Sequence, residues 1–304
     1  LEGGTNGQWT LGSNYFKLST GVGSTSTPNG LASPYAVDIN ADYITDYVYA
    51  GDLEGNMWRF DLTGSASEWN SSKLFETDNN QAITASPIVG VHPTGLENGV
   101  LVYFGTGKYL EPTDNSTVSQ TTQSFYAVWD QFDGSTISKA DLLEQEILDE
   151  QAQLFDTDGD AQQDSLINGR RTTDDTIDWD VNNGWYMDLI VSGSNDNQGE
   201  RQVTRPLLRN GAVIFTTLIP SSSSCDFGGE SWIMELDAAS GSALPMSPFD
   251  FNNNHTFDDG DKIDFVYGQT AERAAASGYQ SEVGITATPA VFVAASKVSE
   301  VKVI

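Results

Sequence analysis

Side chains that carry oxygen recur at every second residue in three short segments of this 304-residue chain. Each segment has such a side chain at its first, third, fifth and ninth positions, while its seventh position can offer a main-chain carbonyl. Calcium takes about six to eight hard oxygen ligands, and a tight loop can wrap them around one ion. The spacing therefore predicts calcium loops whose ligands are Asp38, Asn40, Asp42, Ile44 and Asp46; Asp156, Asp158, Asp160, Gln162 and Asp164; and Asp250, Asn252, Asn254, Thr256 and Asp258.

These three ladders depart from the helix-loop-helix type of calcium site. The sixth position, where glycine normally permits a sharp turn, holds Tyr43, Ala161 and His255. Only the third ladder keeps a carboxylate at its twelfth position, Asp261. We therefore expect none of them to be an EF-hand, and we expect the first to run directly into a strand.

Ordinary turns offer another explanation, because Asp and Asn often bond their own backbone there. Three matches in one acidic chain favour ions over chance turns. The pattern favours the first ladder, then the third, since the second could be a solvated linker before the polar segment 168–180. Crowded carboxylates repel one another, and a divalent cation relieves that repulsion. We expect calcium to stiffen the loops where it reaches about millimolar levels, as it does outside cells.

Composition excludes two classes of protein. The chain has 14 Lys and Arg against 43 Asp and Glu, a formal charge of −29, so it lacks the basic face that nucleic-acid binding requires. No apolar run approaches the ~18 residues that predict a membrane-spanning helix.

Abundant Ser, Thr, Asn and Gly with few Lys favour an exported surface protein. The first residues resemble no leader and include no initiator Met, so we expect a fragment or a processed product.

Short apolar or alternating runs between turn residues dominate the chain and predict antiparallel strands. The clearest hairpin spans residues 46–62, and Asn210-Gly211 predicts a tight two-residue turn. Two stretches, 58–64 and 232–241, each run from a tryptophan to a turn that closes on glycine, an echo typical of propeller blades although its spacing fits no single blade length. Further strands are predicted at 100–105, 124–129, 185–191, 206–208, 212–219 and 231–236.

One segment breaks the strand pattern. In residues 137–154, Ser138 can cap a helix with Asp141 three residues later, and apolar residues recur near helical spacing. We therefore predict one inserted amphipathic helix, packed on a sheet edge.

Catalysis has little support in the residues. His92 and His255 are the only histidines, and His92 lies in a turn, where we expect a surface side chain. The usual zinc and hydrolase motifs are missing. A carboxylate pair for glycoside hydrolysis stays open, because 43 acidic residues always include some pair at a workable separation. Cys225 has an acidic neighbour that argues against a nucleophile, so we expect it to be buried or paired outside this chain.

Longer motifs carry a family resemblance. The first lies in residues 38–62 and includes Tyr49-Ala-Gly-Asp-Leu-Glu-Gly-Asn-Met-Trp-Arg-Phe-Asp-Leu. Others follow in order at 81–87, 103–111, 123–130, 141–144, 184–189, 199–201, 217–221 and 231–237. Together they resemble the C-terminal propeller of the PilY-type proteins of type IV pili, over roughly residues 20–270. The first motif resembles the calcium loop and following hairpin of that domain.

The resemblance implies an all-β, modified and irregular β-propeller at the pilus tip or cell surface, exported through the periplasm. It implies roles in pilus assembly, adhesion and twitching motility, with minor pilins and a host or surface ligand as partners. Asp38, Asn40, Asp42, Ile44 and Asp46 inherit the family's calcium role in pilus extension and retraction, whereas the other two ladders rest on spacing. No Arg-Gly-Asp occurs.

Residues 1–304 are thus predicted to form one incomplete propeller domain, without the family's N-terminal adhesive region and first blades. We expect a calcium-binding pilus protein that is not an enzyme. The alternative from another class is an extracellular propeller enzyme, either a glycan hydrolase or a quinoprotein dehydrogenase.

Overall fold

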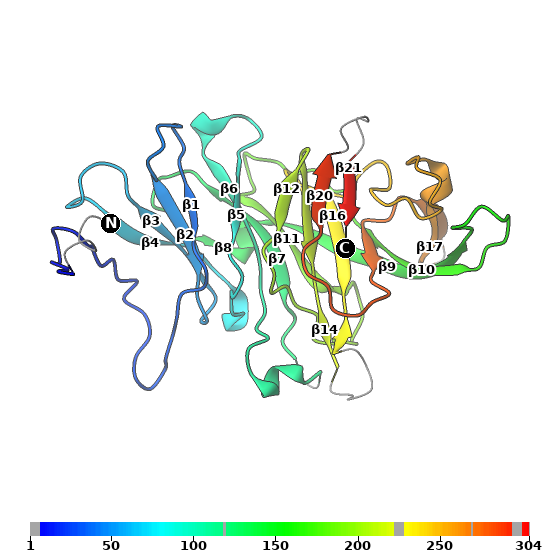
Figure 1. Cartoon of the computed structure of the whole chain (residues 1–304), viewed down its shortest axis with the longest axis horizontal. Helices are drawn as coiled ribbons and strands as arrows, with labels where there is room; N and C mark the ends of the chain where they lie inside the picture. The colour runs from blue at the N-terminus through cyan, green and yellow to red at the C-terminus, as the bar shows by residue number, and fades with distance from the viewer. Residues whose placement is uncertain (1–6, 118–119, 222–227, 269, 294–299, 304) are drawn as a thin grey trace.

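A computed structural model describes residues 7–117, 120–221, 228–268, 270–293 and 300–303, so Cys225 lies outside the described residues. Most of their regular structure is β-strand (Figure 1). Within these ranges, no helix combines the length and the apolar character that crossing a bilayer demands. The predicted all-β fold is confirmed. The helical turns are short 3-10 segments at Asp78–Asn80, Leu96–Asn98, Pro112–Asn115, Lys139–Asp141 and Asp259–Asp261.

Most strands belong to three four-stranded antiparallel units. In spatial order, the first unit comprises β1 (Tyr35–Val37), β2 (Tyr47–Gly51), β3 (Asn56–Asp61) and β4 (Asn70–Glu76). The second comprises β5 (Ile88–Val91), β6 (Val100–Gly105), β7 (Ser124–Asp130) and β11 (Gly184–Val191). The third comprises β12 (Leu207–Arg209), β13 (Ala212–Thr216), β16 (Trp232–Asp237) and β19 (Gly278–Gln280).

A long hairpin joins the outer strands of the second and third units. Its strand β9 (Leu143–Phe155) pairs in parallel with β11, and β10 (Ser165–Thr172) pairs antiparallel with β19. The result is one continuous ten-stranded sheet. The remaining strands are β8 (Ile137–Ser138) beside β4, and the pairs β14 (Ile219–Pro220) with β15 (Gly229–Glu230), β17 (Ile263–Tyr267) with β18 (Thr270–Ala274), and β20 (Ala290–Val293) with β21 (Glu300–Val303).

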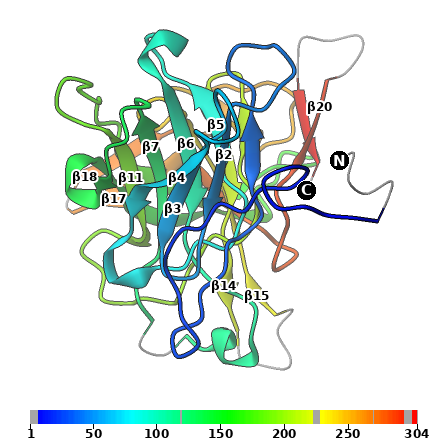
Figure 2. The same ribbon diagram turned by 90° about the vertical axis from the view of Figure 1, so that its left-hand side faces the viewer.

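The first strands of the three units lie next to one another. Strand β5 is in contact with both β1 and β12, and a Cβ added at Gly90 of β5 would lie 2.9 Å from Leu208 Cδ1 of β12. Figure 2, viewed from the side of the first unit, shows the units arranged one behind another. Sheets that radiate from adjacent inner strands are the arrangement of propeller blades.

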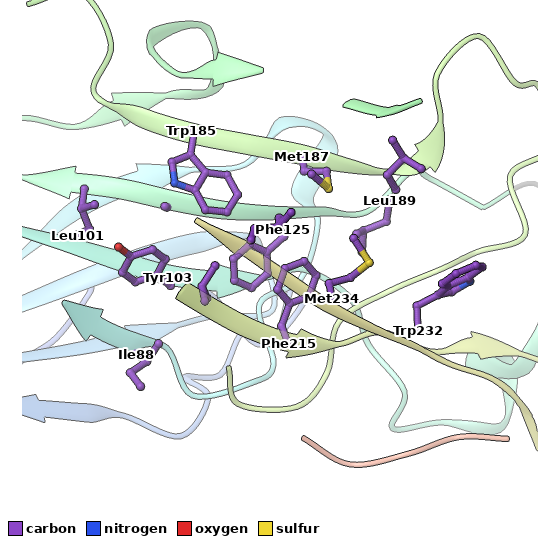
Figure 3. Close-up of a cluster of buried hydrophobic side chains, with 14 residues drawn as sticks. Ile88, Leu101, Tyr103, Phe125, Trp185, Met187, Leu189, Phe215, Trp232 and Met234 are labelled. Atoms are coloured by element: carbon purple, nitrogen blue, oxygen red, sulfur yellow. The ribbon is translucent and has the colours of Figure 1, made fainter. Parts of the chain in front are cut away.

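Two hydrophobic clusters fill the spaces between the units. Along β6, Leu101 and Tyr103 face the cluster between the second and third units, whereas Val102 and Phe104 face the cluster between the first and second. This alternation follows from the two-residue period of a strand. Because both faces of β6 are buried, its sequence is an unbroken apolar run. Figure 3 shows the first of these clusters, in which the rings of Phe125 and Phe215 stack 3.9 Å apart.

The predicted amphipathic helix at 137–154 is wrong. Ser138 and Asp141 do form a capping box, but the helix that it begins is the 3-10 turn Lys139–Asp141. The chain then enters the 13-residue strand β9, whose neighbours are β10 on one side and β11 on the other. Hydrogen bonding to two strands outweighs helical spacing, because strand preference depends mainly on such neighbours.

The sequence echo between 58–64 and 232–241 has a structural basis. Both segments begin in the third strand of their unit, β3 and β16. Asp61 and Asp237 each accept a hydrogen bond from a nearby main-chain N–H, and the turns close on Gly64 and Gly241 with φ of 71° and 72°. The echo therefore marks equivalent places in two units.

Candidate calcium loops

The three acidic ladders lie in connections between strands. The first, residues 38–46, joins β1 to β2, and β2 begins directly after Asp46 as predicted. The second, residues 156–164, is the tip of the long β9–β10 hairpin. The third, residues 250–258, lies between β16 and β17 and leads into the turn Asp259–Asp261.

All three loops share an unusual backbone conformation. Their fourth positions have φ of 60° at Ala41, 81° at Gly159 and 55° at Asn253. Their sixth positions have φ of 70° at Tyr43, 69° at Ala161 and 65° at His255. A residue with a side chain pays roughly 1 kcal/mol for this left-handed conformation. The glycine that calcium loops place at position six is therefore missing, but the turn that it provides is present.

The side chains of the loops turn inward onto their own backbone. Both carboxylate oxygens of Asp38 accept main-chain N–H groups, from Asp42 at 3.2 Å and Tyr43 at 2.7 Å. The first residues of the other loops accept the same sixth-position N–H, at 2.9 Å for Asp156 and 2.8 Å for Asp250. The third side chain of each loop accepts the N–H of the fifth residue, and the fifth side chain accepts that of the seventh.

The second loop brings three carboxylates close together. Asp156, Asp158 and Asp160 each offer an oxygen, and these oxygens all lie within 4.8 Å of one another. Among the described residues this is the one such group of His, Cys, Asp or Glu. Gln162 donates its amide to Asp160 at 2.9 Å, whereas Asp164 accepts from the hydroxyl of Ser165 at 3.4 Å. The carboxylate cluster thus lies in the loop that the sequence favoured least.

The third loop uses a carboxylate beyond its predicted ligands. In the first loop Asp46 accepts the N–H of Ile39, the second residue, at 2.9 Å. In the third loop this contact is made by Asp261, which accepts the N–H of Phe251 at 2.9 Å. Asp261 is fully buried, and burial raises its pKa. Asp258 instead caps the turn that follows, accepting the N–H of Gly260 at 2.7 Å.

The second and third loops touch each other. Asn253 donates its side-chain amide to the carbonyl of Thr157 at 3.1 Å. Beneath this contact the rings of Phe155 and Phe251 lie 5.4 Å apart, within the cluster that also holds Ile263 and Phe265 of β17. The first loop lies apart, between β1 and β2. The described residues therefore present one single loop and one pair of loops.

The donor set of each loop fits a calcium ion. The donors are carboxylate, amide and main-chain oxygens, with the hydroxyl of Thr256 added in the third loop, and all of these are hard ligands of the kind calcium takes. In every loop the first, third and fifth side chains turn toward the loop's own backbone, and in the second loop three carboxylate oxygens already lie within 4.8 Å of one another.

His92 corrects one expectation. It lies in a turn as predicted, but its side chain is 2% exposed and not on the surface. The ring stacks on Trp129 at 4.3 Å and meets Trp179 edge-on at 4.4 Å. Nδ1 lies 2.8 Å from the hydroxyl of Thr94, and burial lowers the pKa of the ring. The two tryptophans come from distant segments, so the short sequence around His92 could not reveal them.

The longest motif of the sequence is explained by a buried carboxylate. Asp52 is 1% exposed in the β2–β3 turn and accepts hydrogen bonds from Trp58 Nε1 at 2.8 Å, Asn29 Nδ2 at 2.9 Å and the main-chain N–H of Asn56 at 2.9 Å. Gly55 has φ of 85°, and a Cβ there would lie 2.0 Å from Thr77 Oγ1. Residues 51–58 are therefore fixed by the packing of the turn.

The inner strands, radiating four-stranded sheets and turn motifs define a modified β-propeller. Residues 11–161 match the family described as the PilY1 beta-propeller domain. The C-terminal domain of Pseudomonas aeruginosa PilY1, known from a crystal structure, matches with a TM-score of 0.74 at 28% identity, covering 90% of this chain and 59% of that chain.

Curated relatives agree with this match. The type IV pilus biogenesis factor PilY1 of Pseudomonas aeruginosa is 31% identical over 297 residues, covering 86% of this chain and 24% of the relative. A PilY1 homolog of Xylella fastidiosa is 36% identical over 230 residues, covering 71% of this chain and 14% of the relative. This chain thus spans a quarter or less of the length of these relatives. It belongs to the PilY1 family, as the sequence motifs predicted.

Proposed function

We propose that this chain is a calcium-binding propeller segment of a type IV pilus biogenesis protein. The relatives are named as pilus biogenesis factors, which supports the pilus role. The calcium role is supported by one observation above all, the backbone conformation and hydrogen-bond ladder common to three loops of different sequence.

Calcium would act on the stiffness of the loops. Without an ion, the clustered carboxylates of the second loop repel one another, and no Lys, Arg or His of the described residues pairs with them. An ion that binds only the folded loop adds its binding free energy to stability, about 2.7 kcal/mol at a hundredfold excess over Kd. The proposed site of action is the cell surface or pilus tip, where calcium is abundant.

The proposed partners are minor pilins and a surface or host ligand. In this proposal, calcium-bound loops present an ordered surface to the pilus tip complex and so affect assembly, extension and retraction, twitching motility and adhesion. A pulldown of purified minor pilins tests the role directly. We expect capture in calcium, loss in chelator and loss with Asp42→Ala.

Asp133→Ala provides a matched control for that experiment. Asp133 also accepts a local main-chain N–H, from Ser135 at 2.8 Å, but it belongs to no ladder. The control should keep calcium-dependent capture. Failure to recover any minor pilin in either buffer would contradict the pilus role.

The absence of catalysis stays a prediction. A glycan hydrolase or quinoprotein would show turnover that a single carboxylate substitution abolishes, or the absorbance of a bound quinone. Neither His92, which is buried between tryptophans, nor the calcium loops offers a specific observation in favour of an enzyme.

A further inference from the structure

A cavity of about 400 Å³ opens between the second and third units, on the side where β9 and β10 join them. Its walls include Leu189 of β11 and Trp232 of β16, both visible in Figure 3. A neighbouring hollow of about 280 Å³ shares Asp196, Gln198 and Glu230 with it. The two hollows therefore form one groove, which we call the β9–β16 groove.

The floor of the groove holds a buried ion network. Arg170 is 1% exposed and pairs with Glu200 at 2.8 Å and with Glu150, which lies opposite it in the β9–β10 ladder. The guanidinium also lies 4.0 Å from the ring centre of Trp232. Thr217 donates its hydroxyl to Glu200 at 2.6 Å. Two carboxylates and an aromatic ring thus engage the charge of Arg170.

The walls carry more negative charge than this arginine balances. Glu150, Asp196, Glu200 and Glu230 line the groove, and no Lys, Arg or His of the described residues does. Glu230 accepts the amide of Gln280 at 2.7 Å, and Asp196 accepts the amide of Gln198 at 3.3 Å. Neither forms an ion pair within the described residues. Charges of one sign gathered along a concave surface attract cations more strongly than the same charges spread over an open surface.

Three other ligand classes fit the groove less well. An anion would be repelled. A chelated metal needs converging oxygens, and the described residues bring three carboxylates within 4.8 Å only in the second calcium loop. A stacked sugar needs an open aromatic face, but Trp232 is 3% exposed and Arg170 covers its ring.

We propose that the β9–β16 groove binds a basic segment of another polypeptide, with the ammonium or guanidinium of a Lys or Arg side chain seated between Glu230 and Asp196. On the adjoining wall, the side-chain amides of Gln151 and Asn168 donate to Asp149 and Gln280, and their side-chain oxygens can accept main-chain N–H groups of that segment. This site is distinct from the three calcium loops and does not depend on them.

The test uses the full chain in chelator at low salt. A fluorescent peptide with two lysines in a glycine background is titrated, beside the all-glycine peptide and spermidine. The groove variant is Glu230→Gln with Asp196→Asn, which removes charge from two exposed side chains without removing volume. The matched control, Glu97→Gln with Asp180→Asn, removes the same charge from two exposed side chains away from the groove.

We expect saturable binding of the lysine peptide, weakened at least tenfold in the groove variant and less than twofold in the control. Thermal melts check that both variants fold. Equal weakening in the two variants would overturn the proposal, because it would reflect only the overall charge of −29. Equal binding of the all-glycine peptide, or binding of spermidine without the lysine peptide, would also overturn it.

Discussion

The β2–β3 turn and the second calcium loop gather carboxylates in opposite ways. Asp52 lies buried in the turn, and the chain itself supplies its donors from Asn29, Asn56 and Trp58. The second loop holds three carboxylates close together near the surface, and the donors that they receive from the described part of the chain are N–H groups of the same loop and the amide of Gln162.

The pKa of Asp52 reflects this difference. Burial alone would raise it, but the hydrogen bonds from Trp58, Asn56 and Asn29 outweigh burial and hold the pKa below its ordinary value. The charge of Asp52 is therefore satisfied by the protein, whereas we propose that the charge of the second loop is balanced by a bound cation. Similar residue types thus serve a structural role in one region and a predicted binding role in the other.

Asp52→Ala should give the largest loss of stability. It leaves the buried indole N–H of Trp58 and the amide of Asn56 without their acceptor, at a cost of roughly 3 kcal/mol or more. Urea unfolding measures this loss, and it should be the same in calcium and in chelator. A smaller loss in calcium than in chelator would contradict this prediction, because it would mean that calcium also stabilises the Asp52 turn.

Gly55→Ala should cost nearly as much, roughly 2 to 4 kcal/mol, because strain at φ of 85° adds to a clash with Thr77. Gly211→Ala is the control, since Gly211 has φ of 80° but nothing within 4 Å of its added Cβ. It should lose only about 1 kcal/mol. Equal losses in the two variants would mean that the close packing of the Asp52 turn contributes nothing.

The stability from the Asp52 charge should depend on acidity. Because the folded pKa is lowered, this contribution is complete above the unfolded pKa, near about 3.9, and disappears as the pH falls through the folded value. The stability difference between the wild type and Asp52→Asn should therefore shrink below about pH 4. A constant difference down to pH 2 would show that hydrogen bonds alone, without charge, explain the turn.

His92 should produce the smallest effect, in a different pH range. Burial lowers its pKa, so the unfolded chain takes up a proton first as the pH falls below about 6.5. Stability should decline from pH 7 towards pH 5, and His92→Phe should flatten this slope while keeping the stack on Trp129. If the slope of stability against pH is the same in the variant, the decline comes from carboxylates and not from His92.

Local signals predicted much of the fold. The β2–β3 hairpin, the turn at Asn210-Gly211 with φ of 50° and 80°, and the strand β6 follow from turn chemistry and apolar runs that lie within a few residues. The strand β9 could not be predicted in this way. Its apolar residues Leu143, Ile147 and Leu148 lie near helical spacing, and the pairing with β10 and with the more distant β11 determines that it is extended.

The candidate calcium loops also combine features that the local sequence predicts with features that it does not. Their positions and candidate ligands follow from spacing, because each loop is nine residues of continuous chain. Two other features depend on tertiary packing. One is the contact between Asn253 and Thr157. The other is the use of Asp261 in the third loop to accept the N–H of the loop's second residue, which Asp46 accepts in the first loop. The β9–β16 groove has no sequence signal, since its carboxylates come from separate segments.

Calcium titration by calorimetry of the chelator-treated chain tests directly whether the ladders are ion sites and the Asp52 turn is not. We expect saturable binding that decreases with each of Asp42→Ala, Asp158→Ala and Asn254→Ala and is unchanged in Asp133→Ala. We also expect a rise in melting temperature with calcium that magnesium does not reproduce. No binding heat and no shift in melting temperature would mean that the three ladders are ordinary acidic turns and not calcium sites.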